Sequence, residues 1–104
     1  MIKIWNVTNG AVLKTLEGHS AQVWSVAFDP SGGTLASGSQ DYTIKIWNVA
    51  DGALLRTLEG HSDGVHSVAF DPSGGTLASG STDQTIKIWD VANGAVLRLS
   101  LIHI

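Results

Sequence analysis

A stretch of sequence that occurs twice decides the fold. Residues 35–47 read Leu-Ala-Ser-Gly-Ser-Gln-Asp-Tyr-Thr-Ile-Lys-Ile-Trp, and residues 77–89 read Leu-Ala-Ser-Gly-Ser-Thr-Asp-Gln-Thr-Ile-Lys-Ile-Trp. The two stretches lie 42 residues apart, and aligning residues 1–42 with residues 43–84 gives 32 identities. A period of about 20–50 residues is typical of an array in which each unit packs against its neighbours. The chain is therefore interpreted as a repeat protein.

Each repeat contains four segments with the composition of β-strands, separated by turn residues. The third segment alternates in polarity and is rich in β-branched and aromatic side chains, which favour a strand. Asp-Pro-Ser-Gly-Gly and Asp-Gly supply the tight turns between segments. The sequence therefore predicts an all-β fold of four-stranded antiparallel sheets. In the first complete repeat the expected strands are residues 23–28, 34–39, 43–49 and 53–58.

The composition narrows the classes of function. Charged residues make up only 14% of the 104 residues, against about 25% in an average chain, so a disordered charged tail is excluded. The net charge of −3 does not attract phosphates, and we expect no nucleic acid partner. The apolar runs are too short for a membrane helix and no signal peptide is recognisable, so we expect no membrane partner and a cytoplasmic location. With no cysteine, disulfides and thiol chemistry are excluded.

Each complete repeat has Gly-His near its start and Trp-Asp or Trp-Asn near its end. The pairs are Gly18-His19 with Trp47-Asn48, and Gly60-His61 with Trp89-Asp90. Together with the four-strand period, this pattern over residues 2–98 resembles the WD-repeat β-propeller family. The resemblance implies four-stranded blades that close into a ring. We expect an incomplete propeller, in which residues 1–17 form a half blade and residues 18–59 and 60–98 form one blade each.

The resemblance also implies a hydrogen-bonded tetrad inside each complete blade. In that tetrad an Asp carboxylate accepts from an imidazole, the imidazole bonds a Ser hydroxyl, and the Ser meets an indole N–H. Buried polar groups need such partners, so the network ties the turns of a blade together. The matching residues are His19, Ser37, Asp41 and Trp47 in the first blade, and His61, Ser79, Asp83 and Trp89 in the second.

A His-Ser-Asp set is also the composition of a hydrolase triad. Here the set recurs in both repeats, and Ser37 lies within an expected strand rather than on the strained turn that such nucleophiles use. The tetrad histidines lie 42 residues apart with no second ligand at metal-binding spacing. The Gly-Gly turns lack the helix and Lys of a phosphate site. We therefore expect no enzyme activity, no catalytic residue, no metal and no cofactor.

The repeats differ in the turn that enters the first strand and in the turn between the second and third strands. These two turns lie at the same end of an antiparallel blade. The resemblance implies that this end is the narrower face, where partners bind, and exposed aromatic side chains are common anchors for protein partners. We interpret these positions as a partner-binding rim; drift at solvent positions and packing of Trp24 on a neighbouring blade are the alternatives. The rim consists of Ala21, Gln22, Trp24, Gln40 and Tyr42 in the first blade, and Asp63, Gly64, His66, Thr82 and Gln84 in the second.

Two hypotheses of function follow. The first is a non-catalytic scaffold for protein–protein interaction that is part of a larger WD-repeat propeller. The alternative is a short unit that assembles through open blade edges into a homo-oligomeric ring and binds ligands at repeated rim sites. After Arg98 the repeat stops, and residues 99–104 form a non-repeat tail that resembles translated sequencing adapter, an artefact. A divergent terminal cap is the other interpretation of this tail.

Overall fold

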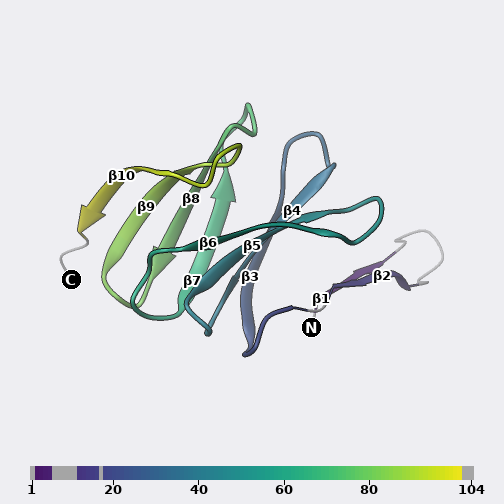
Figure 1. Cartoon of the computed structure of the whole chain (residues 1–104), viewed down its shortest axis with the longest axis horizontal. Coiled ribbons are helices and arrows are strands. Elements are labelled where there is room, and N and C mark those ends of the chain that lie inside the picture. The colour runs from purple at the N-terminus through teal and green to yellow at the C-terminus, as the bar shows by residue number, and fades with distance from the viewer. Residues whose placement is uncertain (1, 6–11, 17, 102–104) are drawn as a thin grey trace.

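Every element in the described part of the chain is a β-strand (Figure 1). The computed structural model describes residues 2–5, 12–16 and 18–101. The predicted all-β fold is confirmed. The strands are β1 (Ile2–Trp5), β2 (Val12–Leu16), β3 (Val23–Phe28), β4 (Thr34–Ser39), β5 (Thr43–Asn48), β6 (Leu54–Glu59), β7 (Val65–Phe70), β8 (Thr76–Ser81), β9 (Thr85–Asp90) and β10 (Val96–Leu101).

The strands form three antiparallel sheets. Neighbours in the first blade follow the order β3-β4-β5-β6, and those in the second blade follow β7-β8-β9-β10. β1 and β2 pair with each other as a separate two-stranded sheet, here called the hairpin. The predicted four-stranded blades are thus confirmed, and they stand side by side in an open array (Figure 1). Among the described ranges no helix could cross a membrane.

Parts of two predicted segments fall outside the described residues. The half blade was expected to contain strands over residues 2–7 and 11–17, of which the structure describes 2–5 and 12–16. β10 continues through Leu101, so the first residues of the predicted tail pair with β9. The remainder of the tail, residues 102–104, lies outside the described part.

The Asp-Pro-Ser-Gly-Gly sequence forms the turn between the first two strands of each blade. In the first blade the Asp29 carboxylate accepts hydrogen bonds from Ser31 Oγ at 2.9 Å and from the Thr34 amide at 3.2 Å. Gly32 has a φ of 77°, a conformation that glycine adopts without a steric penalty. Residues 71–76 repeat this arrangement in the second blade. Identical sequences therefore build identical turns at one end of both blades.

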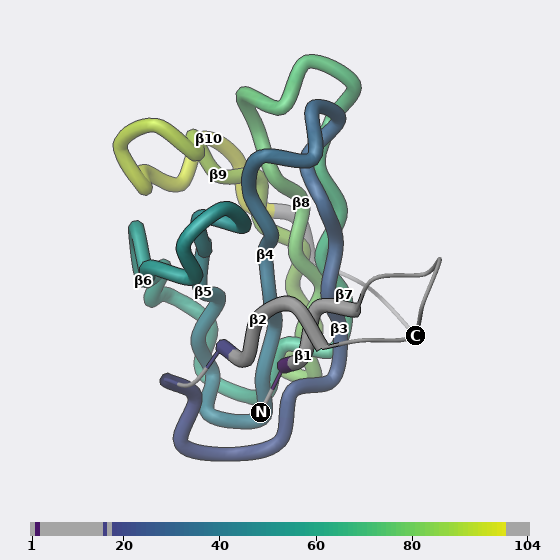
Figure 2. The backbone as a smooth tube through the Cα atoms, turned by 90° about the vertical axis from the view of Figure 1, so that its right-hand side faces the viewer, coloured from purple at the N-terminus to yellow at the C-terminus, as the bar shows by residue number. Residues whose placement is uncertain are grey.

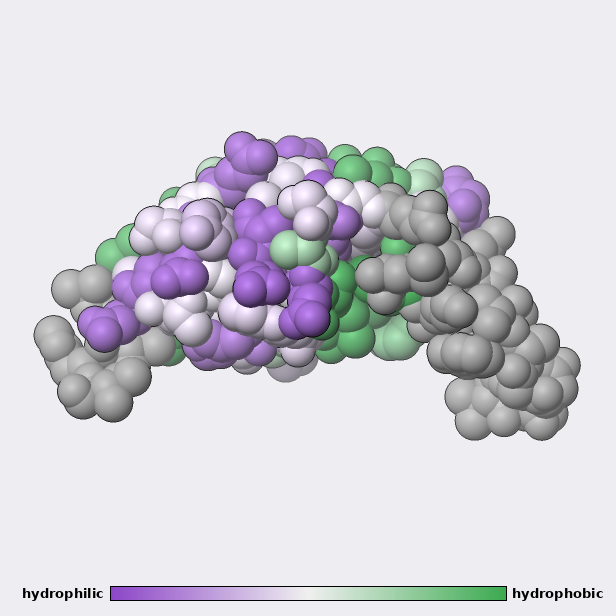
Figure 3. Space-filling model, turned by 90° about the horizontal axis from the view of Figure 1, so that it is seen from below, coloured by the Kyte–Doolittle hydropathy of each residue, from purple (hydrophilic) through white to green (hydrophobic). Residues whose placement is uncertain are grey.

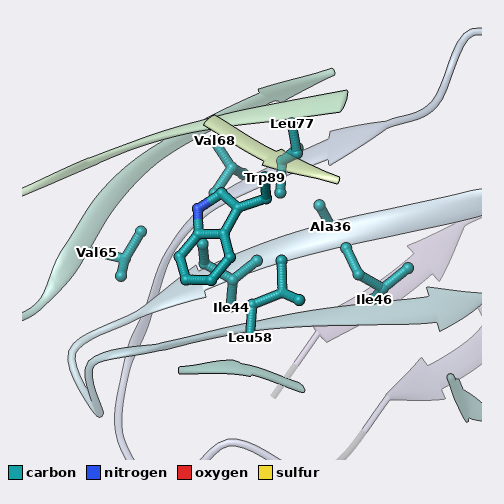
Figure 4. Packing of buried hydrophobic residues seen from close by; sticks show 8 residues of the cluster. All are labelled: Ala36, Ile44, Ile46, Leu58, Val65, Val68, Leu77 and Trp89. Atoms are coloured by element: carbon teal, nitrogen blue, oxygen red, sulfur yellow. The ribbon is translucent and has the colours of Figure 1, made fainter. Parts of the chain in front are cut away.

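The larger hydrophobic core lies between the two blades (Figure 4). Trp89 from the second blade is 1% exposed and lies among aliphatic side chains of both blades. Each fully buried side chain of this kind stabilises the fold by roughly 1.5–3 kcal/mol. Figure 2 shows β3 and β7 side by side along this junction. The buried residues are Ala36, Ile44, Ile46 and Leu58 from the first blade and Val65, Val68, Leu77 and Trp89 from the second.

A smaller core lies between the hairpin and the first blade. Ile2 and Leu16 from the hairpin pack with Leu35 and Trp47. These two first-blade residues correspond, 42 positions on, to Leu77 and Trp89 in the larger core. The hairpin therefore covers the first blade on the same face that the second blade turns toward the first.

Candidate functional site

In the first blade the four predicted tetrad residues form one chain of hydrogen bonds. Trp47 Nε1 donates to Ser37 Oγ at 2.9 Å, and Ser37 Oγ lies 2.6 Å from His19 Nε2. His19 Nδ1 lies 2.9 Å from Asp41 Oδ2. A carboxylate can only accept, so His19 donates from Nδ1 and accepts the Ser37 hydroxyl proton at Nε2. The hydrogen bonds therefore run from Trp47 through Ser37 and His19 to the Asp41 carboxylate, which is the one charged member of the tetrad.

The protonation states of His19 and Asp41 agree with a hydrogen bond that His19 donates to Asp41. Burial lowers the pKa of His19 and outweighs the opposing effect of the Asp41 hydrogen bond, so the ring is neutral. Burial alone would raise the pKa of Asp41, but hydrogen bonds donated by Thr43 and His19 hold it at about 2. The pair is therefore an ionised carboxylate with a neutral imidazole.

The second blade repeats the tetrad. Trp89 Nε1 donates to Ser79 Oγ at 2.7 Å, and Ser79 Oγ lies 2.7 Å from His61 Nε2. His61 Nδ1 lies 2.9 Å from Asp83 Oδ2. Hydrogen bonds from the neighbouring Thr and backbone lower the pKa of Asp83 despite its burial. The structure thus brings together both sets that the sequence singled out.

Sequence reasoning missed the groups that hold the Asp in place. Thr43 Oγ1 and Thr43 N both donate to Asp41 Oδ1, at 2.5 and 3.0 Å, and the Ser20 amide donates to Oδ2 at 3.0 Å. Ser39 Oγ donates to the Gln22 carbonyl at 2.8 Å and accepts from the Asp41 amide at 3.2 Å. The signal was available, since an Asp followed two residues later by Thr is a pattern for a local side-chain turn. That spacing occurs in both repeats.

The geometry of Ser37 argues against a nucleophile. The residue is 0% exposed, and its hydroxyl oxygen already accepts from Trp47 while its proton is directed at His19. A nucleophilic hydroxyl must reach a substrate carbonyl and have donors for the resulting oxyanion. The arrangement instead joins the entry turn, the second strand and the third strand of each blade. Within the described ranges no three metal-ligating side chains gather.

The two variable turns meet at one end of each blade, as predicted from the antiparallel order. The Gln40 amide donates to the Gln22 carbonyl at 2.9 Å, and the Thr82 amide donates to the Gly64 carbonyl at 3.1 Å. Figure 3 looks onto this end of the molecule, where hydrophilic and intermediate residues gather in the middle of the surface and hydrophobic patches lie beside them. Of the ten predicted rim residues Ala21 is half-buried and Gly64 is buried. The exposed ones are Gln22, Trp24, Gln40, Tyr42, Asp63, His66, Thr82 and Gln84.

Tyr42 occupies an unusual position on this rim. Its φ is 77°, in the left-handed region that disfavours residues with a side chain, and the residue is 50% exposed. The Tyr42 amide donates to the Ser39 carbonyl at 3.2 Å, which fixes the turn between β4 and β5. Gln84 has the same conformation in the second blade, with a φ of 67°.

Trp24 lies across the junction between the blades. The register of β3 against β4 shifts between Val23 and Ser25, so Trp24 occupies a β-bulge, a feature that redirects a side chain. Its ring covers Gly64 so closely that a Cβ at that position would lie 2.3 Å from the ring. Trp24 nevertheless remains 41% exposed. Two of the variable positions, 24 in one blade and 64 in the next, therefore contact each other.

Comparison with known proteins agrees with the repeat structure. The family described as "WD domain, G-beta repeat" matches residues 10–48 and 52–90. The Periodic tryptophan protein 2 homolog of Neurospora crassa is 52% identical over 42 residues, which is 40% of this chain and 5% of that protein. Small ribosomal subunit protein RACK1y of Oryza sativa is 45% identical over 42 residues, 40% of this chain and 12% of that protein.

A third relative is Eukaryotic translation initiation factor 3 subunit I of Vanderwaltozyma polyspora, 44% identical over 41 residues. The match covers 39% of this chain and 12% of that protein. The aligned segments thus span about one repeat and a small part of each relative. The family match, by contrast, covers most of the chain, including all strands from β3 to β9. The chain belongs to the WD-repeat family.

Proposed function

We propose that this chain is a non-catalytic scaffold for protein–protein interaction and forms part of a larger WD-repeat propeller. Each tetrad serine is buried and bonded within its blade, so neither of these two hydroxyls is free to attack a substrate. The rim varies between the repeats, whereas the Asp-Pro-Ser-Gly-Gly turn at the opposite end of each blade is identical in sequence. Two relatives carry names of subunits of larger assemblies, an initiation factor and a small ribosomal subunit. A scaffold role for this chain is consistent with the variable rim and with the names of these two relatives.

The observation that carries the proposal is the conformation of Tyr42. A side chain in the left-handed region costs roughly 1–2 kcal/mol relative to the right-handed one, and Gly would avoid that cost. The tyrosine ring is half exposed, so burial in this chain offsets little of it. An aromatic side chain held at a cost on a variable rim is suited to anchoring a protein partner. The proposed partners are proteins; nucleic acid and membranes are not proposed, and a cytoplasmic location remains a prediction.

A peptide selection tests this proposal. Peptides from a random display library are selected on the immobilised chain and their affinities are measured for the wild type and for Tyr42→Gly. We expect Tyr42→Gly to weaken binding at least about tenfold, which corresponds to about 1.4 kcal/mol. Ser31→Ala, at the opposite end of the same blade, is the control and should bind as the wild type does. Equal affinities for wild type and Tyr42→Gly would contradict the proposed rim.

A further inference from the structure

The turn between β9 and β10 contains an asparagine followed by a glycine. Asn93 is exposed, and Gly94 has a φ of 76°. Asparagine is thermally labile, and glycine has no Cβ to hinder the approach of its own backbone nitrogen to the preceding side chain. In that reaction the Gly94 N–Asn93 Cγ bond forms, the Cγ–Nδ2 bond breaks, and ammonia leaves with the Gly94 amide proton. Water then opens the cyclic imide at one of its two carbonyls, which gives aspartate or isoaspartate.

The closed turn activates the carbon that is attacked but withholds the nitrogen that attacks it. The Ala95 amide donates to Asn93 Oδ1 at 2.8 Å, a side-chain turn typical of asparagine. The same donor would stabilise negative charge on Oδ1 during the attack. The Gly94 amide, however, donates to the Asp90 carbonyl at 2.7 Å. The turn therefore has to open at Gly94 before this nitrogen can react.

The first blade holds this turn of the second blade closed. Arg56 on β6 donates from Nη2 to the Ala92 carbonyl at 2.6 Å. A Cβ built on Gly94 would lie 3.2 Å from Arg56 Cδ and 3.3 Å from Leu58 Cδ2, so these two side chains cover the glycine. Leu58 is itself 2% exposed and belongs to the core between the blades. One charged hydrogen bond and this packing thus fasten the turn to the outer strand of the first blade.

The equivalent turn of the first blade indicates what each product would do. Asp51 stands there in place of Asn93, and its Oδ1 accepts from the Ala53 amide at 2.8 Å. The Gly52 amide donates to the Asn48 carbonyl at 2.8 Å, as Gly94 does to Asp90. Aspartate therefore fits this turn. Isoaspartate adds a methylene group to the main chain and so removes the side-chain turn. Either product adds one negative charge to the net charge of −3.

We propose that Asn93 is a deamidation site controlled by the contact between the two blades. Arg56 protects Asn93 while the turn is packed on β6, and opening of that contact leads to a permanent aspartate or isoaspartate. The extent of modification therefore records how often the turn leaves the first blade. Because the rim turn between β8 and β9 lies at the other end of β9, this site is independent of the partner-binding function proposed above.

The rate of deamidation in matched variants tests the role of Arg56. The chains are incubated at mildly alkaline pH, and mass spectrometry follows the tryptic peptide 88–98, in which Asn93 is the one asparagine. Arg56→Met keeps an apolar stem over Gly94 but has no N–H to donate. We expect it to convert about two- to tenfold faster than the wild type, the factor that one hydrogen bond contributes to a local equilibrium. Leu55→Ala, at the neighbouring exposed position of β6, is the matched control and should convert as the wild type does.

Two references accompany these rates. The wild type unfolded in urea gives the rate of the unprotected sequence, and the folded wild type should convert more slowly than that. Asn48, in the tryptic peptide 46–56, is the reference within the same sample. Its next residue is the β-branched Val49, whose amide donates to the Gly33 carbonyl at 3.1 Å, so Asn48 should convert far more slowly than Asn93.

The fold of the variant is measured separately from its rate. In Arg56→Met the indole N–H of Trp89 should stay as protected from hydrogen exchange as in the wild type, because only the turn opens. Asn93→Asp reproduces the aspartate product and should melt as the wild type does.

The proposal is overturned if the folded wild type converts Asn93 as fast as the unfolded chain or no faster than Asn48. It is also overturned if Arg56→Met converts at the wild-type rate, or if Leu55→Ala converts as fast as Arg56→Met. Loss of Trp89 protection in Arg56→Met would mean that the whole blade opens, which contradicts the turn as the point of control.

Discussion

The contact between Trp24 and Gly64 makes a sharp prediction about stability. Gly64→Ala places a Cβ about where the Trp24 ring now lies, since the built Cβ is 2.3 Å from the ring. The φ of Gly64 is not among the positive values in this chain, so the alanine itself introduces no backbone strain. The cost comes from moving the indole. If the ring loses about 100 Å² of burial, the loss is about 2.5 kcal/mol at about 25 cal/mol per Å².

The gain from replacing a glycine reduces the expected destabilisation by Gly64→Ala. Replacing glycine by alanine in an accessible conformation stabilises by about 0.4–1 kcal/mol through the unfolded chain. The net destabilisation is then about 1.5–2 kcal/mol, within the range of about 1–3 kcal/mol usual for overpacking. Urea unfolding followed by circular dichroism measures it. Gly33→Ala, whose Cβ meets only Ser31 Oγ at 3.4 Å, is the matched control and should change the free energy of unfolding little.

A double-mutant cycle isolates the contact itself. Trp24→His puts the second repeat's residue at this position and removes most of the ring. In that background Gly64→Ala should cost less than about 0.5 kcal/mol, which leaves a coupling energy above about 1 kcal/mol. The reasoning is refuted if Gly64→Ala alone is as stable as the wild type, or if the two substitutions are additive.

The tetrad and the rim give the remaining predictions. Ser37→Ala leaves Trp47 Nε1 and His19 Nε2 without their partner and should lower the free energy of unfolding by about 2–4 kcal/mol, measured by urea unfolding. The pKa of Asp41 is lowered to about 2 from 3.8, so its contribution is present above pH 3.8 and is lost as the pH falls toward 2; Asp41→Asn should flatten this part of the stability profile. Because the folded pKa of His19 lies below 6.5, the unfolded chain takes up the proton first, and stability should fall as the pH drops below 6.5. Tyr42→Gly should raise the melting temperature, because glycine adopts the left-handed backbone conformation of this position without the steric cost of roughly 1 kcal/mol that a side chain carries.

The strands were predictable because they depend on local patterns that the repeat displays twice. The run Thr-Ile-Lys-Ile-Trp is alternating and β-branched, and it forms β5 and β9 as expected. The tetrad residues followed from the resemblance. The bonds from Thr43 to Asp41 were visible in principle, because the two residues lie two positions apart, whereas the bond from the Ser20 amide joins residues 21 positions apart and has no local signal.

The junction was not predictable in the same way. The bulges at Trp24 and His66 change register by one residue, and the sequence of a short strand carries no signal for such a shift. The pairing of Trp24 with Gly64 joins two different blades, so no periodicity within a repeat reports it. Packing of Trp24 on a neighbouring blade was one alternative at the sequence level, and the structure adds that the indole sits directly over Gly64 while 41% of the residue stays exposed.

Each tetrad joins the entry turn of a blade to its second and third strands. Hydrogen exchange of the indole N–H groups tests these bonds most directly. Trp47 and Trp89 are each 1% exposed and donate to a buried serine, whereas Trp24 is 41% exposed. By NMR, the indole protons of Trp47 and Trp89 should exchange only through global unfolding, and that of Trp24 should exchange much faster in the same sample. Exchange of Trp47 and Trp89 at the rate of Trp24, in a chain that retains its β-sheet spectrum, would contradict the closed tetrads.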